Sequence, residues 1–261
     1  MTGEATVRAS DIPFPPKVED FFPAPLFSVG GFDVTKFALL VWVAVALIII
    51  FFALSYRDPK LVPGRLQWMA ESIYGFAREN MAKDMIGPEG LRFAPYLATL
   101  FCFILVNNLF GIIPFVQIAP TSHIAFPAML AVISWVMFVY VGIRRFGFLK
   151  YMKKTLILPA PLFILPLLIP IEFLSTFVVR PFTLAVRLFA NMFAGHIILL
   201  VFTLGGFVLL NAGALFAPVS LFSWLLTLAL TFLETLVALL QAFIFTVLTS
   251  SYIQGALAEE H

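Results

Sequence analysis

The sequence predicts an all-α integral membrane protein. Of its 261 residues, 62% are hydrophobic and only 11% are charged, whereas about a quarter of the residues in a soluble domain are charged. Several apolar runs reach the roughly 20 residues that a helix needs to cross about 30 Å of hydrocarbon. The 16 basic residues are unevenly distributed, which indicates an orientation in the membrane. Most soluble folds are excluded.

The first expected transmembrane helix covers residues 37–56. It stops at a charged stretch that contains the helix breaker Pro59. The Pro-rich segment at 1–34 is expected to lie outside the membrane as an external segment. Residues 35–261 are then expected to form the membrane domain.

A helix over residues 64–84 is expected to lie on the membrane surface. Its apolar side chains recur at helical spacing on one face, opposite a charged face. A helix of this kind places its apolar face against the acyl chains. The apolar face comprises Leu66, Met69, Ala70, Ile73, Ala77 and Met81, and the charged face comprises Glu71, Arg78 and Glu79.

Residues 93–115 and 124–143 are expected to form a transmembrane hairpin. Its short connection, 116–123, has no Lys or Arg, whereas 57–92 contains six basic residues and 144–154 contains five. Lys and Arg accumulate in cytoplasmic connections, so we place the two basic connections in the cytoplasm. The N-terminus then lies outside and the C-terminus lies in the cytoplasm.

The remaining apolar sequence is too long for ordinary spans. Residues 160–210 could form two spans joined between Arg180 and Arg187, but that joint would expose two arginines outside, against the charge rule. A single helix of about 45 residues would be about 70 Å long and must lie strongly tilted. We therefore expect two long tilted helices, over 160–210 and 215–256, joined by a turn near Gly213.

Five ionisable residues lie within this expected hairpin. A charge at membrane depth costs a few kcal/mol at least, so it marks a candidate functional site. At about 100° per residue, each helix carries a polar stripe that could admit water and conduct protons. The first stripe comprises Arg180, Arg187 and Asn191, with His196 on the opposite face; the second comprises Thr227, Glu234, Gln241 and Tyr252; Glu172 is the remaining ionisable residue.

Structural interpretations of these residues stay open. Arg180 could satisfy the Phe177 carbonyl that Pro181 leaves without a donor, or it could pair with Glu172 two turns away. Arg187 is different, because no acid lies three or four residues from it in its own helix. Simple polar or solvated roles are open for four others, which are His196, Glu234, Gln241 and, in the outside loop, His123.

Several long motifs carry the most specific signal. They are Arg187-Leu188-Phe189-Ala190-Asn191-Met192-Phe193-Ala194-Gly195-His196, Asn108-Leu109-Phe110-Gly111-Ile112-Ile113-Pro114, Gln67-Trp68, Leu240-Gln241-Ala242-Phe243-Ile244-Phe245 and the ending Glu259-Glu260-His261. Together they resemble the bacterial form of the a-subunit family of F-type ATP synthases. The resemblance covers the chain from about Phe37. Ala190 departs from the glycine that is usual in the family.

The resemblance implies a stator channel subunit of the Fo sector that performs no covalent catalysis. In that family, a ring of c subunits carrying membrane-embedded carboxylates rotates against the a subunit, and two offset half-channels deliver and remove protons. Proton flow is thereby coupled to rotation and ATP synthesis. Implied partners are the c ring, the b subunits of the peripheral stalk and the F1 head. The implied location is the bacterial inner (plasma) membrane, as a multi-pass protein; no cofactor, metal or nucleic acid is implied.

The family's essential arginine maps onto Arg187. A fixed cation favours the ionised form of each arriving rotor carboxylate, and an arginine is always protonated, so it cannot relay the proton between half-channels. The titratable pair of the family is preserved with its order reversed relative to some members. The outside half-channel maps onto His196, Glu234, Asn191, Gln241 and His123, and the cytoplasmic half-channel maps onto Glu172 and Arg180.

Two other function classes were weighed against this one. A proton-translocating subunit of a redox-coupled membrane pump also uses charged residues in broken or tilted helices, but the sequence shows no defensible quinone signature. An intramembrane hydrolase would need a serine elbow, a metal motif or paired intramembrane Asp residues, and the sequence has none of them.

Overall fold

The computed structural model describes residues 27–29, 32–113, 116, 118–156 and 163–258. Within that part of the chain, five helical stretches are long and apolar enough to cross a membrane. The predicted all-α integral membrane fold is therefore confirmed. Most of the expected external segment at 1–34, Pro114 of the second motif and the ending 259–261 lie outside the described residues.

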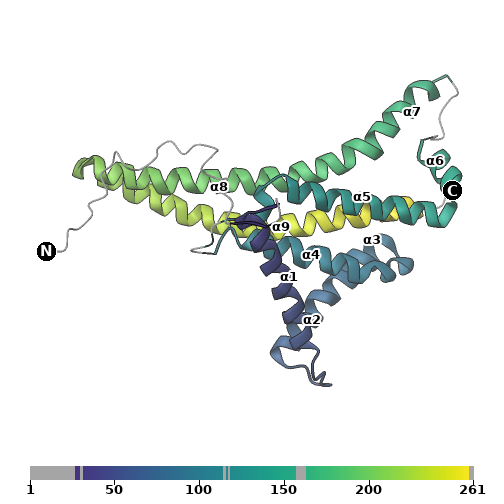
Figure 1. Ribbon diagram of the computed structural model, residues 1–261, viewed down its shortest axis with the longest axis horizontal. Coiled ribbons are helices and arrows are strands. Elements are labelled where there is room, and N and C mark those ends of the chain that lie inside the picture. Colours follow the sequence, from purple (N-terminus) through teal and green to yellow (C-terminus); the bar gives the residue numbers. More distant parts are fainter. Residues whose placement is uncertain (1–26, 30–31, 114–115, 117, 157–162, 259–261) are drawn as a thin grey trace.

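Helices account for nearly all of the regular structure in the described residues (Figure 1). One short antiparallel hairpin, which the sequence analysis did not predict, precedes them. In chain order the elements are β1 (Phe27–Val29), β2 (Phe32–Val34), α1 (Lys36–Ser55), α2 (Arg65–Phe76), the π-helix η3 (Ala77–Lys83), α3 (Asp84–Ile86), the 3-10 helix η4 (Pro88–Phe93), α4 (Ala94–Leu109), the 3-10 helix η5 (Pro120–Ser122), α5 (Ala125–Phe146), α6 (Phe148–Leu156), α7 (Leu165–Leu174), the π-helix η6 (Ser175–Val179), α8 (Arg180–Ala212), the 3-10 helix η7 (Ala214–Phe216) and α9 (Ala217–Leu257).

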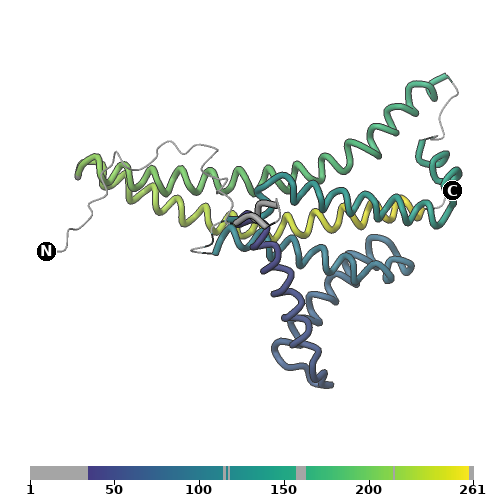
Figure 2. Tube along the Cα trace, viewed as in Figure 1, coloured from purple at the N-terminus to yellow at the C-terminus, as the bar shows by residue number. Residues whose placement is uncertain are grey.

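The two long C-terminal helices form the axis of the molecule. α8 and α9 lie side by side as an antiparallel hairpin (Figure 2), α5 packs against both, and α4 packs against α9. α7, η6 and α8 form one continuous helix of 48 residues, about 70 Å long at 1.5 Å per residue. This rules out two spans separated at Arg180 to Arg187, and a helix of that length fits a membrane only when strongly tilted.

The core lies where α4, α5, α8 and α9 meet. Its apolar side chains are buried against one another. They pack against protein and not against lipid, and this packing stabilises the fold. α1 by contrast runs away from this bundle (Figure 1) and is mostly exposed. Representative core residues are Leu97, Ile104, Phe138, Leu188, Phe245 and Ile253.

The helix expected on the membrane surface is only partly of that kind. Leu66 and Met69 at its beginning are exposed, whereas Ala77 and Met81 farther along are fully buried. The burial arises because η3 and α3 pack against α4 and α9, and the Met81 carbonyl accepts a hydrogen bond from Ser250 of α9. Much of the apolar face therefore contacts protein where the sequence predicted contact with lipid.

The ends of the expected hairpin also differ from the prediction. α4 ends at Leu109 and not at 115, because the chain turns there with hydrogen bonds from Gly111 N–H to the Asn108 carbonyl and from Ile112 N–H to the Leu109 carbonyl. These i→i+3 bonds close a tight turn in place of a further helical turn.

An additional short helix, α6, follows α5. It was not expected from the sequence, which assigned this stretch only to a basic connection. Its Tyr151 is buried against Gly142 of α5, where an added Cβ would lie 2.1 Å from the tyrosine ring. Gly142 thus provides the space that allows α6 to fold back, and burial raises the pKa of the Tyr151 hydroxyl.

Candidate functional site

His196 on α8 and Glu234 on α9 meet in the interface between the two long helices. Nδ1 of His196 lies 2.7 Å from Oε1 of Glu234, and the two side chains are only 8% and 5% exposed. Nε2 of His196 accepts the backbone N–H of Ala119 at 3.2 Å. A nitrogen that accepts a hydrogen bond carries no proton, so Nε2 is the unprotonated nitrogen in this contact. Both carboxylate oxygens of Glu234 are buried and have no hydrogen-bond partner among the described residues, despite the short distance to His196. The arrangement brings two titratable groups into buried contact.

Two glycines provide the space for this pair. A Cβ on Gly111 would come within 2.3 Å of Cε1 of His196, and a Cβ on Gly195 would come within 2.9 Å of Oε1 of Glu234. Any larger residue at Gly111 or Gly195 would displace the titratable groups. Both glycines lie within the sequence motifs without a predicted role, although a glycine inside an apolar motif is a signal for a close approach.

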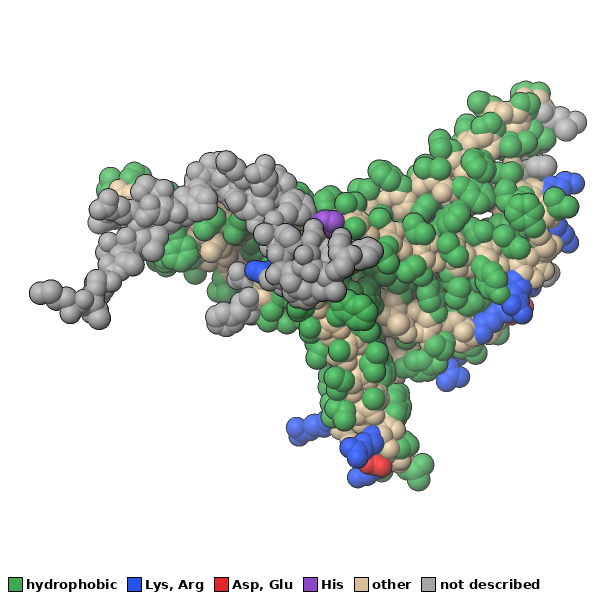
Figure 3. Space-filling model, in the orientation of Figure 1, with side chains coloured by type: hydrophobic (Ala, Val, Ile, Leu, Met, Phe, Trp, Pro, Cys, Tyr) green, Lys and Arg blue, Asp and Glu red, His purple; other side chains and the backbone are tan. Residues whose placement is uncertain are grey.

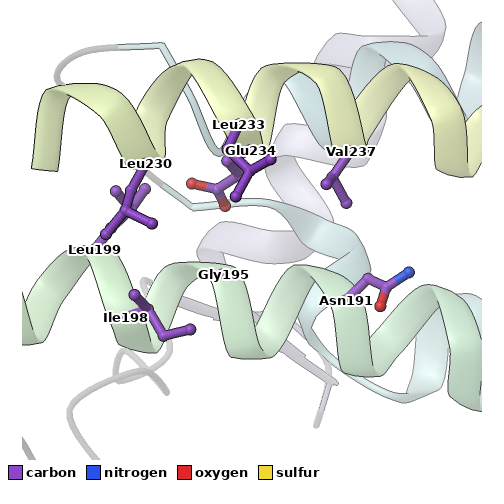
Figure 4. A pocket seen from close by; sticks show the side chains of 8 residues that line it. All are labelled: Asn191, Gly195, Ile198, Leu199, Leu230, Leu233, Glu234 and Val237. Carbon is purple, nitrogen blue, oxygen red and sulfur yellow. The ribbon is translucent and has the colours of Figure 1, made fainter. Parts of the chain in front are cut away.

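A small cleft opens beside Glu234 between α8 and α9. It encloses about 90 Å³, which is room enough for water. Figure 4 shows the Glu234 carboxylate projecting from α9 toward α8 near Gly195, with Asn191 farther along α8. The lining is Asn191, Gly195, Ile198, Leu199, Leu230, Leu233, Glu234 and Val237.

Asn191 and Gln241 form a second polar contact between the same helices. Nδ2 of Asn191 donates to Oε1 of Gln241 at 2.7 Å. The amide nitrogen of Gln241 is buried and has no partner in the described part of the chain. Buried donors of this kind are normally satisfied, so the site has an unused hydrogen-bond donor about two turns from Glu234.

Arg187 lies on the exposed side of α8, one turn before Asn191. Its neighbours Leu184 and Leu188 are buried against the bundle, whereas the Arg187 side chain points away from it. Among the residues that the structure describes, Arg187 makes no hydrogen bond or ion pair. The helical phase predicted this separation from His196, which is buried on the opposite face.

Arg180 and Glu172 form an ion pair, which is the structural alternative left open from the sequence. Nη2 of Arg180 lies 3.6 Å from Oε1 of Glu172, with the two side chains 35% and 22% exposed. The guanidinium also lies 5.5 Å from the ring centroid of Tyr252. Arg180 lies 16 residues before His196 along the same helix, so this cluster is separate from the His196 and Glu234 pair.

The π-helix η6 explains how that ion pair forms. Eight residues along an α-helix place two side chains about 80° apart. A π segment accommodates one additional residue, so Glu172 and Arg180 are related as if they were seven residues apart, or about 20°. η6 ends just before Pro181, which has no N–H to continue the regular bonding.

His123 lies directly after η5, the turn that begins beside Ala119. Its ring packs against Phe37 at 5.5 Å and Phe126 at 6.2 Å between centroids, and it is half-buried. The chain thus connects His123 to the Ala119 contact of His196 through a single 3-10 turn.

Asn108 and Thr121 anchor that turn and were missed as site residues. Thr121 donates to Oδ1 of Asn108 at 2.7 Å, and Nδ2 of Asn108 donates to the Ala238 carbonyl at 3.2 Å. All three groups are buried. The signal in the sequence was the adjacent Asn107 and Asn108 inside an apolar span, since buried amides need partners.

Comparison with known proteins adds the deciding observation. The family model described as the ATP synthase A chain matches residues 38–254. The chain belongs to the ATP synthase A chain family. It is 45% identical over 232 residues to ATP synthase subunit a of Nocardioides sp., covering 87% of this chain and 83% of the relative. With subunit a of Rhodococcus erythropolis it is 41% identical over 265 residues, covering 100% and 96%.

A third relative, ATP synthase subunit a of Frankia alni, is 45% identical over 254 residues, covering 94% of this chain and 87% of the relative. Membership of the ATP synthase A chain family makes this chain the proton-translocating subunit of Fo, within the ATP synthase complex. With five membrane-competent helices in its described part, it is a multi-pass membrane protein. A subunit of a redox-coupled pump is not favoured.

Proposed function

We propose that this subunit a forms two proton half-channels and couples proton flow to rotation of the c ring through Arg187. The observation that carries the proposal is an exposed arginine on a membrane-competent helix with no partner in the described residues. An unpaired guanidinium in hydrocarbon costs at least a few kcal/mol. A carboxylate on a neighbouring rotor subunit would remove that cost.

Arg187 would act as a fixed charge. A cation beside an arriving rotor carboxylate favours its ionised form, so the carboxylate releases its proton there. Because arginine stays protonated, it cannot pass the proton on, and the two half-channels stay separate. The subunit itself makes and breaks no covalent bond other than those to transferred protons.

The outside half-channel would use the polar groups between α8 and α9. A proton arriving near His123 would reach the His196 and Glu234 pair, whose facing atoms lie 2.7 Å apart. Water in the adjoining cleft and the Asn191 and Gln241 contact would carry it toward the rotor.

The cytoplasmic half-channel would contain Glu172, with Arg180 as its positioning partner. Glu172 is partly exposed, so it can exchange protons with water while the ion pair holds its carboxylate in place. The ion pair is exposed enough that water still reaches the carboxylate of Glu172. This suits a group that receives protons at the cytoplasmic end of the path.

The orientation follows from the charge distribution. Lys and Arg side chains gather at the α1 to α2 connection and at the end of the molecule near α6 (Figure 3). The positive-inside rule places both in the cytoplasm, with 1–34 as an external segment and 35–261 as the membrane domain. The c ring, the b subunits of the peripheral stalk and, through them, the F1 head would be its partners in a bacterial plasma membrane.

Substitution of the arginine tests the proposal. We expect Arg187→Gln to abolish proton-driven ATP synthesis in inverted membrane vesicles, because the rotor carboxylate would no longer be ionised at that point. Synthesis is normalised to the amount of assembled complex. The matched control is Arg78→Gln, because Arg78 is also exposed but lies in η3, outside the α8 and α9 hairpin. This variant should retain synthesis. Wild-type rates in Arg187→Gln would refute the proposal.

A further inference from the structure

A second hollow lies away from α8 and α9, between η4, which precedes α4, and the end of α5. It measures about 440 Å³, within the range of about 300–1,000 Å³ that small-molecule sites occupy. No residue of the proposed proton path lines it. The lining consists of Arg92, Phe93, Tyr140, Val141, Arg144 and Arg145.

The hollow carries an uncompensated positive charge. Arg145 is paired with Glu89, but Arg92 and Arg144 have no acidic partner among the residues that the structure describes. Among the described residues, three arginines and one glutamate leave a surplus of positive charge at this point. A site with that surplus attracts an anion.

Several donors in the hollow remain for a ligand. Cζ of Arg92 lies 4.8 Å from the centroid of the Phe93 ring, and no hydrogen bond from its guanidinium is present among the described residues. Arg144 donates to the Tyr140 hydroxyl oxygen at 2.7 Å. The hydroxyl hydrogen of Tyr140 is therefore available to an acceptor in the hollow.

An exposed apolar stripe leads along α5 to this hollow. Its residues follow helical spacing and end at Tyr140, one turn before Arg144. They are between 48% and 64% exposed, although α5 is long and apolar enough to cross a membrane. The stripe comprises Met129, Val132, Ile133, Val136 and Tyr140.

We propose that this hollow binds the phosphate headgroup of an anionic phospholipid whose acyl chain lies along the α5 stripe. Arginine guanidiniums match phosphate oxygens in geometry and charge. The surplus charge favours an anionic lipid over a zwitterionic one, which brings its own cation. The apolar stripe favours a lipid over free phosphate, because free phosphate has no acyl chain to cover the stripe.

Photolabelling of the complete ATP synthase tests the site. The enzyme is reconstituted in phosphatidylcholine vesicles that contain a trace of phosphatidylglycerol or phosphatidylcholine bearing a photoactivatable acyl chain. We expect phosphatidylglycerol to label the α5 segment 129–140 about tenfold more than phosphatidylcholine does, which is the effect of about 1.4 kcal/mol of headgroup preference. Equal labelling by the two probes, or no labelling of α5, overturns the proposal.

Matched variants locate the headgroup. Arg92→Gln combined with Arg144→Gln should lower phosphatidylglycerol labelling about tenfold and leave phosphatidylcholine labelling unchanged. The control combines Arg57→Gln with Arg65→Gln, which removes the same charge from exposed arginines in the α1 to α2 connection, and should label as the wild type does. An equal loss in the control overturns the proposal.

Two further measurements keep the test decisive if the double variant does not assemble. Tyr140→Phe, which removes only a hydroxyl, should lower phosphatidylglycerol labelling measurably. Wild-type labelling should also fall with rising salt, because the contact is ionic. Full competition by inorganic phosphate would instead identify a soluble-anion site and overturn the lipid assignment.

Discussion

At the scale of single residues, this subunit a accommodates charge inside its membrane-competent helices in three different ways. His196 and Glu234 lie in a buried contact. Glu172 and Arg180 neutralise each other in a half-exposed ion pair. Arg187 has neither kind of partner within the described chain. Only the ion pair is complete within the described chain, because both carboxylate oxygens of Glu234 are buried without a hydrogen-bond partner there. For Arg187 we propose that the opposite charge comes from a rotor subunit.

The His196 and Glu234 pair leads to an exchange prediction. Replacing both together, His196→Glu with Glu234→His, should preserve more ATP-driven proton pumping than either single replacement. Each single change puts two like groups together, and a buried charge without a partner costs about 3–5 kcal/mol, whereas the exchange keeps one acid and one base. Quenching of a pH-sensitive dye in inverted vesicles measures the pumping. Equal losses in all three variants would contradict the shared site.

At the scale of elements, departures from regular α-helix decide which residues meet. η6 brings Glu172 into phase with Arg180, and η3 contains Met81, whose carbonyl accepts a hydrogen bond from Ser250 of α9. The turn after α4 brings Gly111 to the imidazole of His196. Each departure occurs at a contact of the site or the core, which is where π segments are often retained.

The phase argument for η6 predicts opposite results for a deletion and an insertion. Deleting Val178 should convert the segment to regular α-helix and keep Glu172 about 20° from Arg180, so proton pumping should be largely retained. Inserting one alanine after Val178 should rotate Glu172 by about 100° and break the ion pair, lowering pumping strongly. If both variants pump alike, the π segment does not set this contact.

At the scale of the whole molecule, charge and hydrophobic surface together define how the subunit lies in the membrane. Large apolar side chains remain exposed on α1, α5, α8 and α9, which is a liability in water and the expected state in lipid. Most of the basic residues lie in the connections at the ends of the spans (Figure 3). This distribution makes the orientation a testable property of the whole chain.

Accessibility of single cysteines tests the orientation. In a Cys102→Ala background, Lys60→Cys should react with an impermeant thiol reagent only in inverted vesicles. Ser122→Cys should react only in right-side-out spheroplasts, because its turn has no Lys or Arg and is expected outside. The reverse pattern would invert the assigned topology. Cys102 is buried, so labelling of the wild-type protein by the thiol reagent should also be low.

The sequence by itself predicted the number of spans, an orientation and the set of charged residues worth testing. The free energy of transferring apolar side chains into lipid adds up along a segment, so length and composition are sufficient to predict a span. A charge at membrane depth is recognisable because it opposes this transfer. Its expectation for residues 64–84 was partly wrong, because an apolar face looks the same whether it contacts lipid or other helices. Residues 148–156 do carry the pattern of a short amphipathic helix, which had been interpreted only as a basic connection.

Only the tertiary structure decided which groups meet. The Ala119 N–H that fixes the tautomer of His196 comes from 77 residues away, and the space at Gly111 and Gly195 exists only once α4, α8 and α9 are packed. The phase between Glu172 and Arg180 depends on one π segment, which residue spacing does not reveal. Contacts of this kind depend on packing between distant segments, where a shift of a single residue changes the partner.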